Sequence, residues 1–337
     1  MAGSRLRKLM NAKNVILGNA YVSYFDILGF TSRFISGDLM HHYEDLITVV
    51  KEIKDSDLNI LLFSDSIVIF SEHFGKVKNA AQIFYTWGIL QDFWLRGAIA
   101  QGNVTKFDIA SFTYDRKIIL PFLGEGYLKA YKLESTLNIS GIVIDDALFS
   151  SDESIREYLA PDTDYVEYEE YLPKRGYEGK KRLLLPTENS VRQIVDTMYF
   201  EEMLKSHIED IDKYINTFCF FIEFLLDNAV RETVTAFLQK LLGTLELQSQ
   251  WVLIPSKVVI IFVVLVEGLL NRYRSGKHKD CSDPSLLELD IGNIVKTLKE
   301  QGYLPAFIDY LLEYDKRRHT TIYRDINNLR SSRQSFV

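Results

Sequence analysis

The sequence predicts an α+β protein, with a ferredoxin-like βαββαβ domain followed by a mainly α-helical C-terminal domain. Between Tyr21 and Asp145, short apolar runs alternate with longer stretches whose apolar residues recur at helical spacing. From about Glu188 onward, helical spacing continues nearly to the C-terminus. The order of elements is β-α-β-β-α-β with one further helix and strand. This split βαβ pattern predicts a mostly antiparallel sheet with helices on one face.

The elements of the first domain follow from their apolar patterns. Residues 1–20 are expected to form a short N-terminal arm. A strand at Tyr21–Leu28 precedes a long amphipathic helix at Thr31–Lys54, in which apolar residues recur every three or four positions. The other expected elements are strands at Leu58–Phe63 and Ile67–Phe70, a helix at Val77–Leu90, a strand at Trp94–Val104, a helix opened by Gly124-Glu125-Gly126 that runs to about Leu133, and a strand at Gly141–Asp145.

The pattern divides the chain into an arm at 1–20, a domain at 21–187 and a helical domain at 188–337. The polar, tyrosine-rich segment Ser150–Gly179 is expected to add edge strands together with Arg182–Pro186. The most apolar run, Val258–Val266, is far shorter than the roughly 20 residues of a membrane span. We therefore expect it to form a buried helix or strand of a core, with no membrane insertion.

Charge and cysteine content narrow the function classes. A net charge of −7 provides no basic face for duplex nucleic acid, so no nucleic-acid partner is expected. The two cysteines, Cys219 and Cys281, are too few for a disulfide framework and suit a reducing cytosol. The basic N-terminus lacks the apolar core of a signal peptide. These features favour a cytoplasmic location.

Two carboxylates stand out because each lies within or between apolar runs. Asp26 belongs to YFDILGF (Tyr24–Phe30), and Asp65 belongs to LLFSDSIVIF (Leu61–Phe70), where Ser64-Asp65-Ser66 reads as a hairpin-like turn. A carboxylate in an apolar run is costly to bury without a partner. Hard divalent ions take oxygen ligands, and carboxylates on adjacent strands can hold a pair of ions. Taken singly, Asp26 could cap the next helix and Asp65 could form an Asx turn.

Four motifs, in this order, resemble the class III nucleotidyl cyclases. YFDILGFT is similar to their strand with the first metal-binding Asp, and FSDSIVIF to the hairpin with the second. LRGAIAQGNV (Leu95–Val104) resembles their following strand, and FLGEGYLKAYKLES (Phe122–Ser135) their Gly-initiated helix. The match covers about Tyr21–Asp145. The segments FDILGF, FSDSI, RGAI and AY-LE are most similar to those of the pyrimidine cyclases of bacterial Pycsar anti-phage systems.

The resemblance implies a two-metal cyclase. The 3′-OH of a nucleoside triphosphate attacks its own α-phosphorus, and pyrophosphate leaves. Asp26, Asp65 and the backbone carbonyl of Ile27 would ligate two divalent ions, Mn²⁺ or Mg²⁺. The resemblance also implies a homodimer, a phage-derived trigger and a separate effector that responds to the cyclic nucleotide.

Departures from the family pattern indicate which nucleotide base the substrate carries. The family helix carries an Asn and an Arg where this chain has Leu128 and Lys132, and the purine-reading positions hold Leu61 and Pro121. Lys132 keeps a positive charge without the planar fork of an Arg. A pyrimidine substrate is therefore expected, and UTP is favoured over CTP on the resemblance alone.

The candidate catalytic residues are Asp26, Asp65 and Arg96, and Phe25, Arg96 and Lys132 are candidates for nucleotide binding. Arg96 lies in an apolar strand and could bind phosphate bidentately, but a structural ion pair explains it equally well. Bulky Phe25 would suit a pocket for a single ring. The alternatives are a cytidylate or purine cyclase, another two-metal palm enzyme, although the GG(D/E)EF hairpin is missing, and a catalytically silent module for nucleotide sensing or protein contacts.

Overall fold

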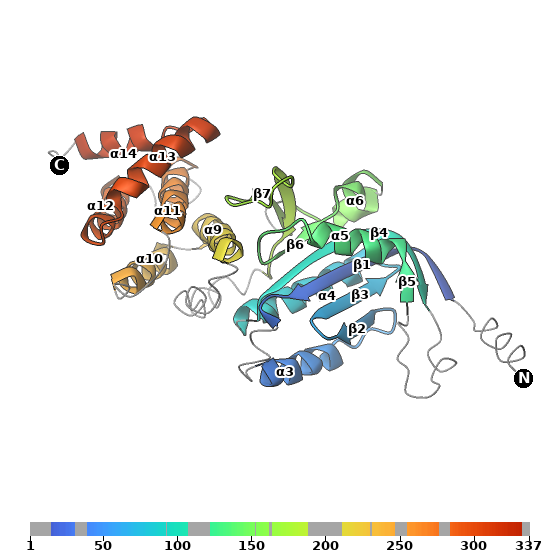
Figure 1. Ribbon diagram of the computed structural model, residues 1–337. Coiled ribbons are helices and arrows are strands. Elements are labelled where there is room, and N and C mark those ends of the chain that lie inside the picture. The colour runs from blue at the N-terminus through green and yellow to red at the C-terminus, as the bar shows by residue number, and fades with distance from the viewer. Residues whose placement is uncertain are drawn as a thin grey trace, which may run out of the picture. The chain divides into compact units, whose positions relative to one another are not determined.

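The computed structural model describes residues 15–30, 39–91, 93–106, 122–151, 153–161, 164–187, 211–229, 231–246, 255–275 and 284–331. The chain divides into two compact units (Figure 1). The sheet unit comprises Met1–Glu169 and Lys174–Glu188. The helical unit comprises Glu170–Pro173 and Asn189–Val337.

The sheet unit contains a mostly antiparallel sheet, which confirms the mixed α and β class. The strand order is β2-β3-β1-β4-β6-β8-β7, and β5 pairs with β4. Neighbouring strands are antiparallel except β4 and β6, which are parallel. The described elements are β1 (Val15–Ile27), α3 (Leu39–Glu52), β2 (Asn59–Phe63), β3 (Ser66–Ser71), α4 (Phe74–Leu90), β4 (Leu95–Lys106), β5 (Phe122–Gly124), α5 (Glu125–Glu134), β6 (Gly141–Ile144), α6 (Asp146–Ser151), a 3₁₀ helix (Glu153–Glu157), β7 (Tyr165–Glu169) and β8 (Lys180–Leu184).

Strand β1 begins earlier than the sequence pattern predicted. We expected an arm up to residue 20, but Val15 already pairs with Lys106 of β4. The register shifts between Leu17 and Ala20, where Asn19 has a positive φ of 40°. Asn tolerates this left-handed conformation better than most residues, so a bulge carries the strand past a position that reads as a break.

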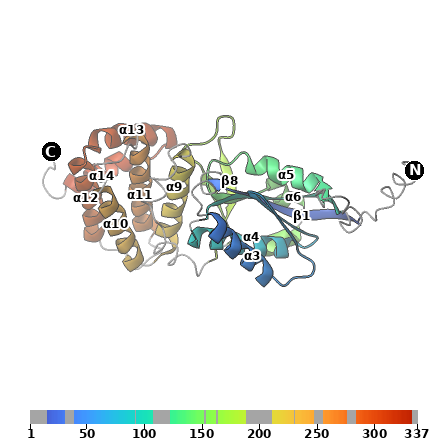
Figure 2. The same cartoon turned by 60° about the horizontal axis from the view of Figure 1, so that its bottom comes forward.

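Helices cover both faces of the sheet, whereas the sequence pattern predicted one face (Figure 2). Successive side chains of a strand point to opposite faces. The Tyr24 ring meets Tyr127 and Tyr131 of α5 edge-on, at centroid distances of 5.7 Å and 5.4 Å. The Phe25 ring lies 6.4 Å from that of Phe84 in α4. Helix α5 covers the additional face because its tyrosines share one side of the helix.

Close approach of α5 to β4 depends on two glycines. A Cβ atom at Gly102 would lie 2.5 Å from the backbone nitrogen of Gly126, and one at Gly126 would lie 2.9 Å from Val22 Cγ2. We expect Gly102→Ala to lower the free energy of unfolding by about 1–3 kcal/mol, measured in urea, because backbone atoms must move apart.

Gly292→Ala is the matched control for this substitution. Gly292 is exposed inside α12 (Pro284–Glu300), and a Cβ there meets nothing within 4 Å. The free energy of unfolding of this variant should rise by about 0.5–1 kcal/mol, since Ala is a better helix former than Gly. Equal stability of Gly102→Ala and the wild type would show that α5 does not depend on this contact.

The helical unit confirms the helical character expected of the C-terminal part. The expected core run Val258–Val266 lies in α11, and Val259 to Val266 are at most 3% exposed. Among the described helices, none combines the length and apolar character that a bilayer crossing requires. The helices are α9 (Ile211–Asn228), α10 (Arg231–Glu246), α11 (Pro255–Ser275), α12, α13 (Leu304–Arg318) and α14 (Ile322–Ser331).

Candidate functional site

Asp26 lies at the end of the central strand β1. It is paired in register with Ser66 of β3 on one side and with Arg96 of β4 on the other. The alternation of the strand places its side chain on the same face as Tyr24, the face that α5 covers. The side chain is 25% exposed, so the carboxylate is accessible from solvent.

Asp65 lies beside this strand end. The turn Ser64-Asp65 joins β2 to β3, as the sequence predicted, and Ser64 has a positive φ of 55°, which is uncommon for a residue other than Gly. The backbone N–H of Ile27 donates a hydrogen bond of 2.8 Å to the carbonyl of Asp65. Burial and the nearby charge of Asp65 raise the pKa of Tyr43 in α3. The fold therefore brings both predicted aspartates to one end of the sheet.

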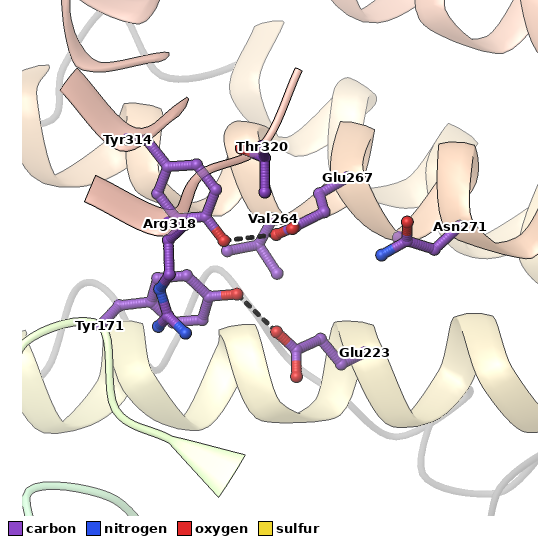
Figure 3. A pocket seen from close by; sticks show the side chains of 9 residues that line it. Tyr171, Glu223, Val264, Glu267, Asn271, Tyr314, Arg318 and Thr320 are labelled. Carbon is purple, nitrogen blue, oxygen red and sulfur yellow. Dashed lines mark hydrogen bonds between the residues drawn. The ribbon is translucent and has the colours of Figure 1, made fainter. Parts of the chain in front are cut away.

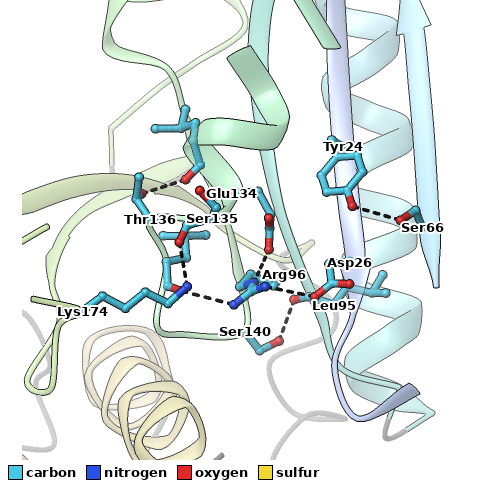
Figure 4. A network of polar contacts seen from close by, with 12 residues as sticks. Tyr24, Asp26, Ser66, Leu95, Arg96, Glu134, Ser135, Thr136, Ser140 and Lys174 are labelled. Carbon is cyan, nitrogen blue, oxygen red and sulfur yellow. Dashed lines mark hydrogen bonds and ion pairs between the residues drawn. The ribbon is translucent and has the colours of Figure 1, made fainter. Parts of the chain in front are cut away.

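Arg96 is held by two carboxylates (Figure 4). Its Nη2 donates to Asp26 Oδ2 at 3.0 Å, and its Nε donates to Glu134 of α5. Its Nη1 also donates to the carbonyl of Leu137 at 3.4 Å. The Arg96 side chain is 12% exposed, so this is a nearly buried charge cluster. The geometry corresponds to the ion-pair interpretation of Arg96.

Glu134 is the member of this cluster that the sequence did not single out. Its side chain is only 3% exposed. Burial raises its pKa, and the Arg96 guanidinium acts in the opposite direction. The residue belongs to the fourth motif of the resemblance, but a Glu at the end of a helix ordinarily reads as solvated.

Tyr24 borders the same site. Its hydroxyl shares a 2.9 Å hydrogen bond with the hydroxyl of Ser66. Burial raises the pKa of Tyr24, the Ser66 bond opposes that shift, and the charge of Asp26 adds to it. Tyr24 therefore stays protonated at neutral pH and offers a neutral hydroxyl next to Asp26.

The other predicted site residues do not all lie at the strand end with Asp26. Ile27 is buried, and its backbone joins the turn that carries Asp65. Phe25 is fully buried on the opposite face of the sheet and is not brought to Asp26. Lys132 lies exposed in the last turn of α5, and Leu128 on the same helix is 48% exposed.

The donors at the strand end fit a hard divalent ion. Asp26 and Asp65 offer carboxylate oxygen atoms, and the single positive charge of Arg96 is paired with both Asp26 and Glu134. Across the described ranges, no three His, Cys, Asp or Glu side chains converge into a metal cage. Mg²⁺ is ordinarily held by one or two carboxylates together with substrate phosphates, so the protein needs to provide no more than two carboxylate ligands.

Comparison with known proteins assigns no family. No protein-family model matches the chain. No curated protein matches it either.

Proposed function

We propose that this protein is a nucleotide cyclase of the class III type. It would convert a pyrimidine nucleoside triphosphate, with UTP favoured, into the 3′,5′-cyclic nucleotide and pyrophosphate. The observation that carries the proposal is the shared position of two aspartates. Asp26 ends the central strand, and the hydrogen bond from Ile27 to the carbonyl of Asp65 holds the second aspartate beside it. The order β2-β3-β1-β4 with antiparallel neighbours supports the ferredoxin-like prediction.

The reaction requires a site whose carboxylates can bind divalent ions and, through them, a negatively charged triphosphate. The bond between the 3′ oxygen and the α-phosphorus forms, the bond from that phosphorus to the α,β-bridging oxygen breaks, the bridging oxygen leaves with pyrophosphate, and the hydroxyl proton passes to solvent water. Asp26, Asp65 and the carbonyl of Ile27 would hold the divalent ions. When bound, such ions lower the pKa of the hydroxyl and neutralise phosphate charge. Arg96, anchored by Glu134, supplies a fixed positive charge beside Asp26.

The proposal includes a homodimer and a signalling role. Leu128 and Lys132 of α5 are exposed, which leaves them accessible to a second copy of the chain. Arg96 and Asp26 of one chain contact each other, so both would serve the same half of a shared site. The cyclic nucleotide would act as a second messenger in anti-phage defence through a separate effector.

A silent cyclase-like module for nucleotide sensing is the second candidate. It is favoured by the double pairing of Arg96 with Asp26 and Glu134, which engages the guanidinium within the protein. The exposed Lys132 also stands where the family has an Arg.

Incubation of the purified full chain with each of the four NTPs and Mn²⁺ distinguishes these functions. We expect cyclic UMP to be the main product when products are identified by mass spectrometry, with cyclic AMP and cyclic GMP minor. This expectation rests on the purine-reading positions of the family, which hold Leu61 and Pro121 in this sequence and offer no hydrogen-bonding side chain.

Each other outcome has a defined meaning. Dominant cyclic CMP would change only the choice of pyrimidine. Dominant cyclic AMP or cyclic GMP would contradict the pyrimidine assignment. Absence of product from every nucleotide, together with saturable UTP binding, would replace the cyclase with the silent module.

A further inference from the structure

The helical unit contains a polar cavity of about 340 Å³ (Figure 3). Small-ligand sites commonly have volumes of roughly 300–1,000 Å³, so the cavity can hold a small molecule. It lies wholly within this unit, because the segment Glu170–Pro173 belongs to it. Its lining includes the polar side chains of Tyr171, Glu223, Glu267, Asn271, Tyr314 and Arg318.

The sequence places these groups on one side of three helices. Glu267, Gly268 and Asn271 lie on the same face of α11, since residues three or four positions apart are neighbours on a helix. Tyr314 and Arg318 are similarly one turn apart in α13. A polar strip on α11, formed by Glu267 and Asn271, thus interrupts a helix that is otherwise largely apolar and buried.

Two glutamates face this cavity, and each accepts a hydrogen bond from a tyrosine. The Tyr171 hydroxyl donates to Glu223, and the Tyr314 hydroxyl donates to Glu267. Burial raises the pKa of Glu223 to about 7, and the charge of Glu267 adds to that rise. Burial also raises the pKa of Glu267. Two carboxylates that repel each other in a low-polarity site destabilise the fold unless a positive charge offsets them.

The tyrosine rings provide flat faces beside these carboxylates. The rings of Tyr171 and Tyr314 are nearly parallel, with centroids 6.1 Å apart and an interplanar angle of 19°. The guanidinium carbon of Arg318 lies 5.4 Å and 5.8 Å from the two centroids. The pair of rings therefore already accommodates one guanidinium group.

The charge of the cavity is incompletely balanced by its own residues. Glu223 and Glu267 carry two negative charges when ionised, and Arg318 carries one positive charge. One negative charge remains within the cavity lining when both glutamates are ionised, which requires a pH above the pKa of about 7 of Glu223. Glu223 and Glu267 are both half-buried residues of the cavity lining.

We propose that this cavity binds a small planar organic cation of the guanidinium or amidinium class. Such a cation donates paired N–H groups to a carboxylate and stacks on aromatic rings. It supplies, in addition to Arg318, the second positive charge that balances the two glutamates when both are ionised. An anion is disfavoured because both carboxylates line the cavity.

The test measures binding of methylguanidinium to the full chain at millimolar concentration, by titration calorimetry at constant ionic strength. Methylurea, which has a similar shape and no charge, is the matched neutral probe. We expect saturable binding of methylguanidinium alone. Glu223→Gln and Glu267→Gln should each weaken it by about tenfold or more, since hydrogen bonds to charged groups are the stronger ones.

Glu313→Gln is the matched control variant, because Glu313 is an exposed residue of α13 outside the cavity. It should bind methylguanidinium as the wild type does. The fold of each variant is checked by circular dichroism and thermal unfolding, and a Glu→Gln variant that unfolds is replaced by Tyr171→Phe, which removes only the hydroxyl that donates to Glu223. Failure of methylguanidinium to bind, equal binding of methylurea, or an equal loss in Glu313→Gln would overturn the proposal. Preferential binding of phosphate would also overturn it.

The affinity should depend on pH in a defined direction. Methylguanidinium competes with the proton on Glu223, so its affinity should rise as pH increases through about 7. An affinity independent of pH would contradict the contact with Glu223. The charged and titratable groups that face Glu223 are Tyr171, Glu267 and Arg318, with Cys219 and Asp227 on its own helix.

Discussion

Asp26→Asn and Asp65→Asn are each expected to lower the rate of cyclic nucleotide formation by about 10³-fold or more. Charge stabilisation by bound ions is worth several kcal/mol, and each 1.36 kcal/mol corresponds to about a factor of ten in rate. Asn keeps the shape of Asp but removes the negative charge that holds a divalent ion. The measurement is the initial rate with saturating UTP and Mn²⁺.

Asp65→Asn is the sharper of the two variants, because Asp26→Asn also weakens the bond from Arg96. Asp55→Asn is the matched control: Asp55 precedes β2 and pairs with Lys76 away from the strand end. It should retain the wild-type rate. Unchanged rates in both site variants, with folding confirmed by thermal unfolding, would remove the catalytic role of the two aspartates.

Arg96→Met is expected to lower the free energy of unfolding by about 3–5 kcal/mol, measured in urea at neutral pH. Removing one partner of a buried ion pair leaves the other charge uncompensated. Here the charge left behind is Glu134, whose side chain is 3% exposed, together with Asp26. This loss should be much larger than that from a surface pair.

The loss should also depend on pH, and the sign follows from Glu134. Burial raises its pKa in the folded state above the ordinary value of 4.5. The folded protein therefore binds more protons than the unfolded chain in that window, and stability falls as pH rises through it. Without Arg96 the pKa of Glu134 rises further, so Arg96→Met should be least destabilising in acid, where Glu134 is protonated.

Two further variants separate the buried charge from lost packing. Arg96→Met combined with Glu134→Leu should recover part of the stability, because no unpaired carboxylate remains at position 134. Arg182→Met is the control in the same unit, because the partners of Arg182, Asp146 and Glu167, have side chains that are 72% and 48% exposed. This substitution should lower the free energy of unfolding by about 1 kcal/mol or less. If Arg96→Met costs no more than Arg182→Met, the cluster does not stabilise the fold.

The sequence predicted most of the sheet unit because its strands have simple apolar patterns. Buried runs such as Ile67–Phe70 lie within strands, and the helix expected at Val77–Leu90 lies within α4. The start of β1 was missed because a bulge at Asn19 has no reliable sequence signal. The second helical layer was missed because the βαββαβ pattern predicts helices on one face only, and α5 follows that pattern as an additional helix.

The site was predictable only where an unusual residue stood in a regular pattern. Asp26 and Arg96 were noticed because charges are rare inside apolar strands. Glu134 was missed because its burial arises from tertiary packing of the end of α5. Phe25 was assigned to the site although alternation along β1 sends neighbouring side chains to opposite faces. The cavity in the helical unit joins residues far apart in the chain, such as Tyr171 and Tyr314, and local patterns cannot bring them together.

The discontinuous path of the helical unit limits how the chain can be divided into autonomous modules. The side chain of Asn216, which is fully buried in α9, donates to the carbonyl of Leu172 and accepts from its N–H, both at 2.9 Å. A fragment that begins at residue 189 would lack Leu172. Its amide group would then lack these two bonds, which together stabilise the unit by about 1–3 kcal/mol. A helical fragment should therefore become self-sufficient only when residues 170–173 are restored, for example as an added peptide that complements it in trans.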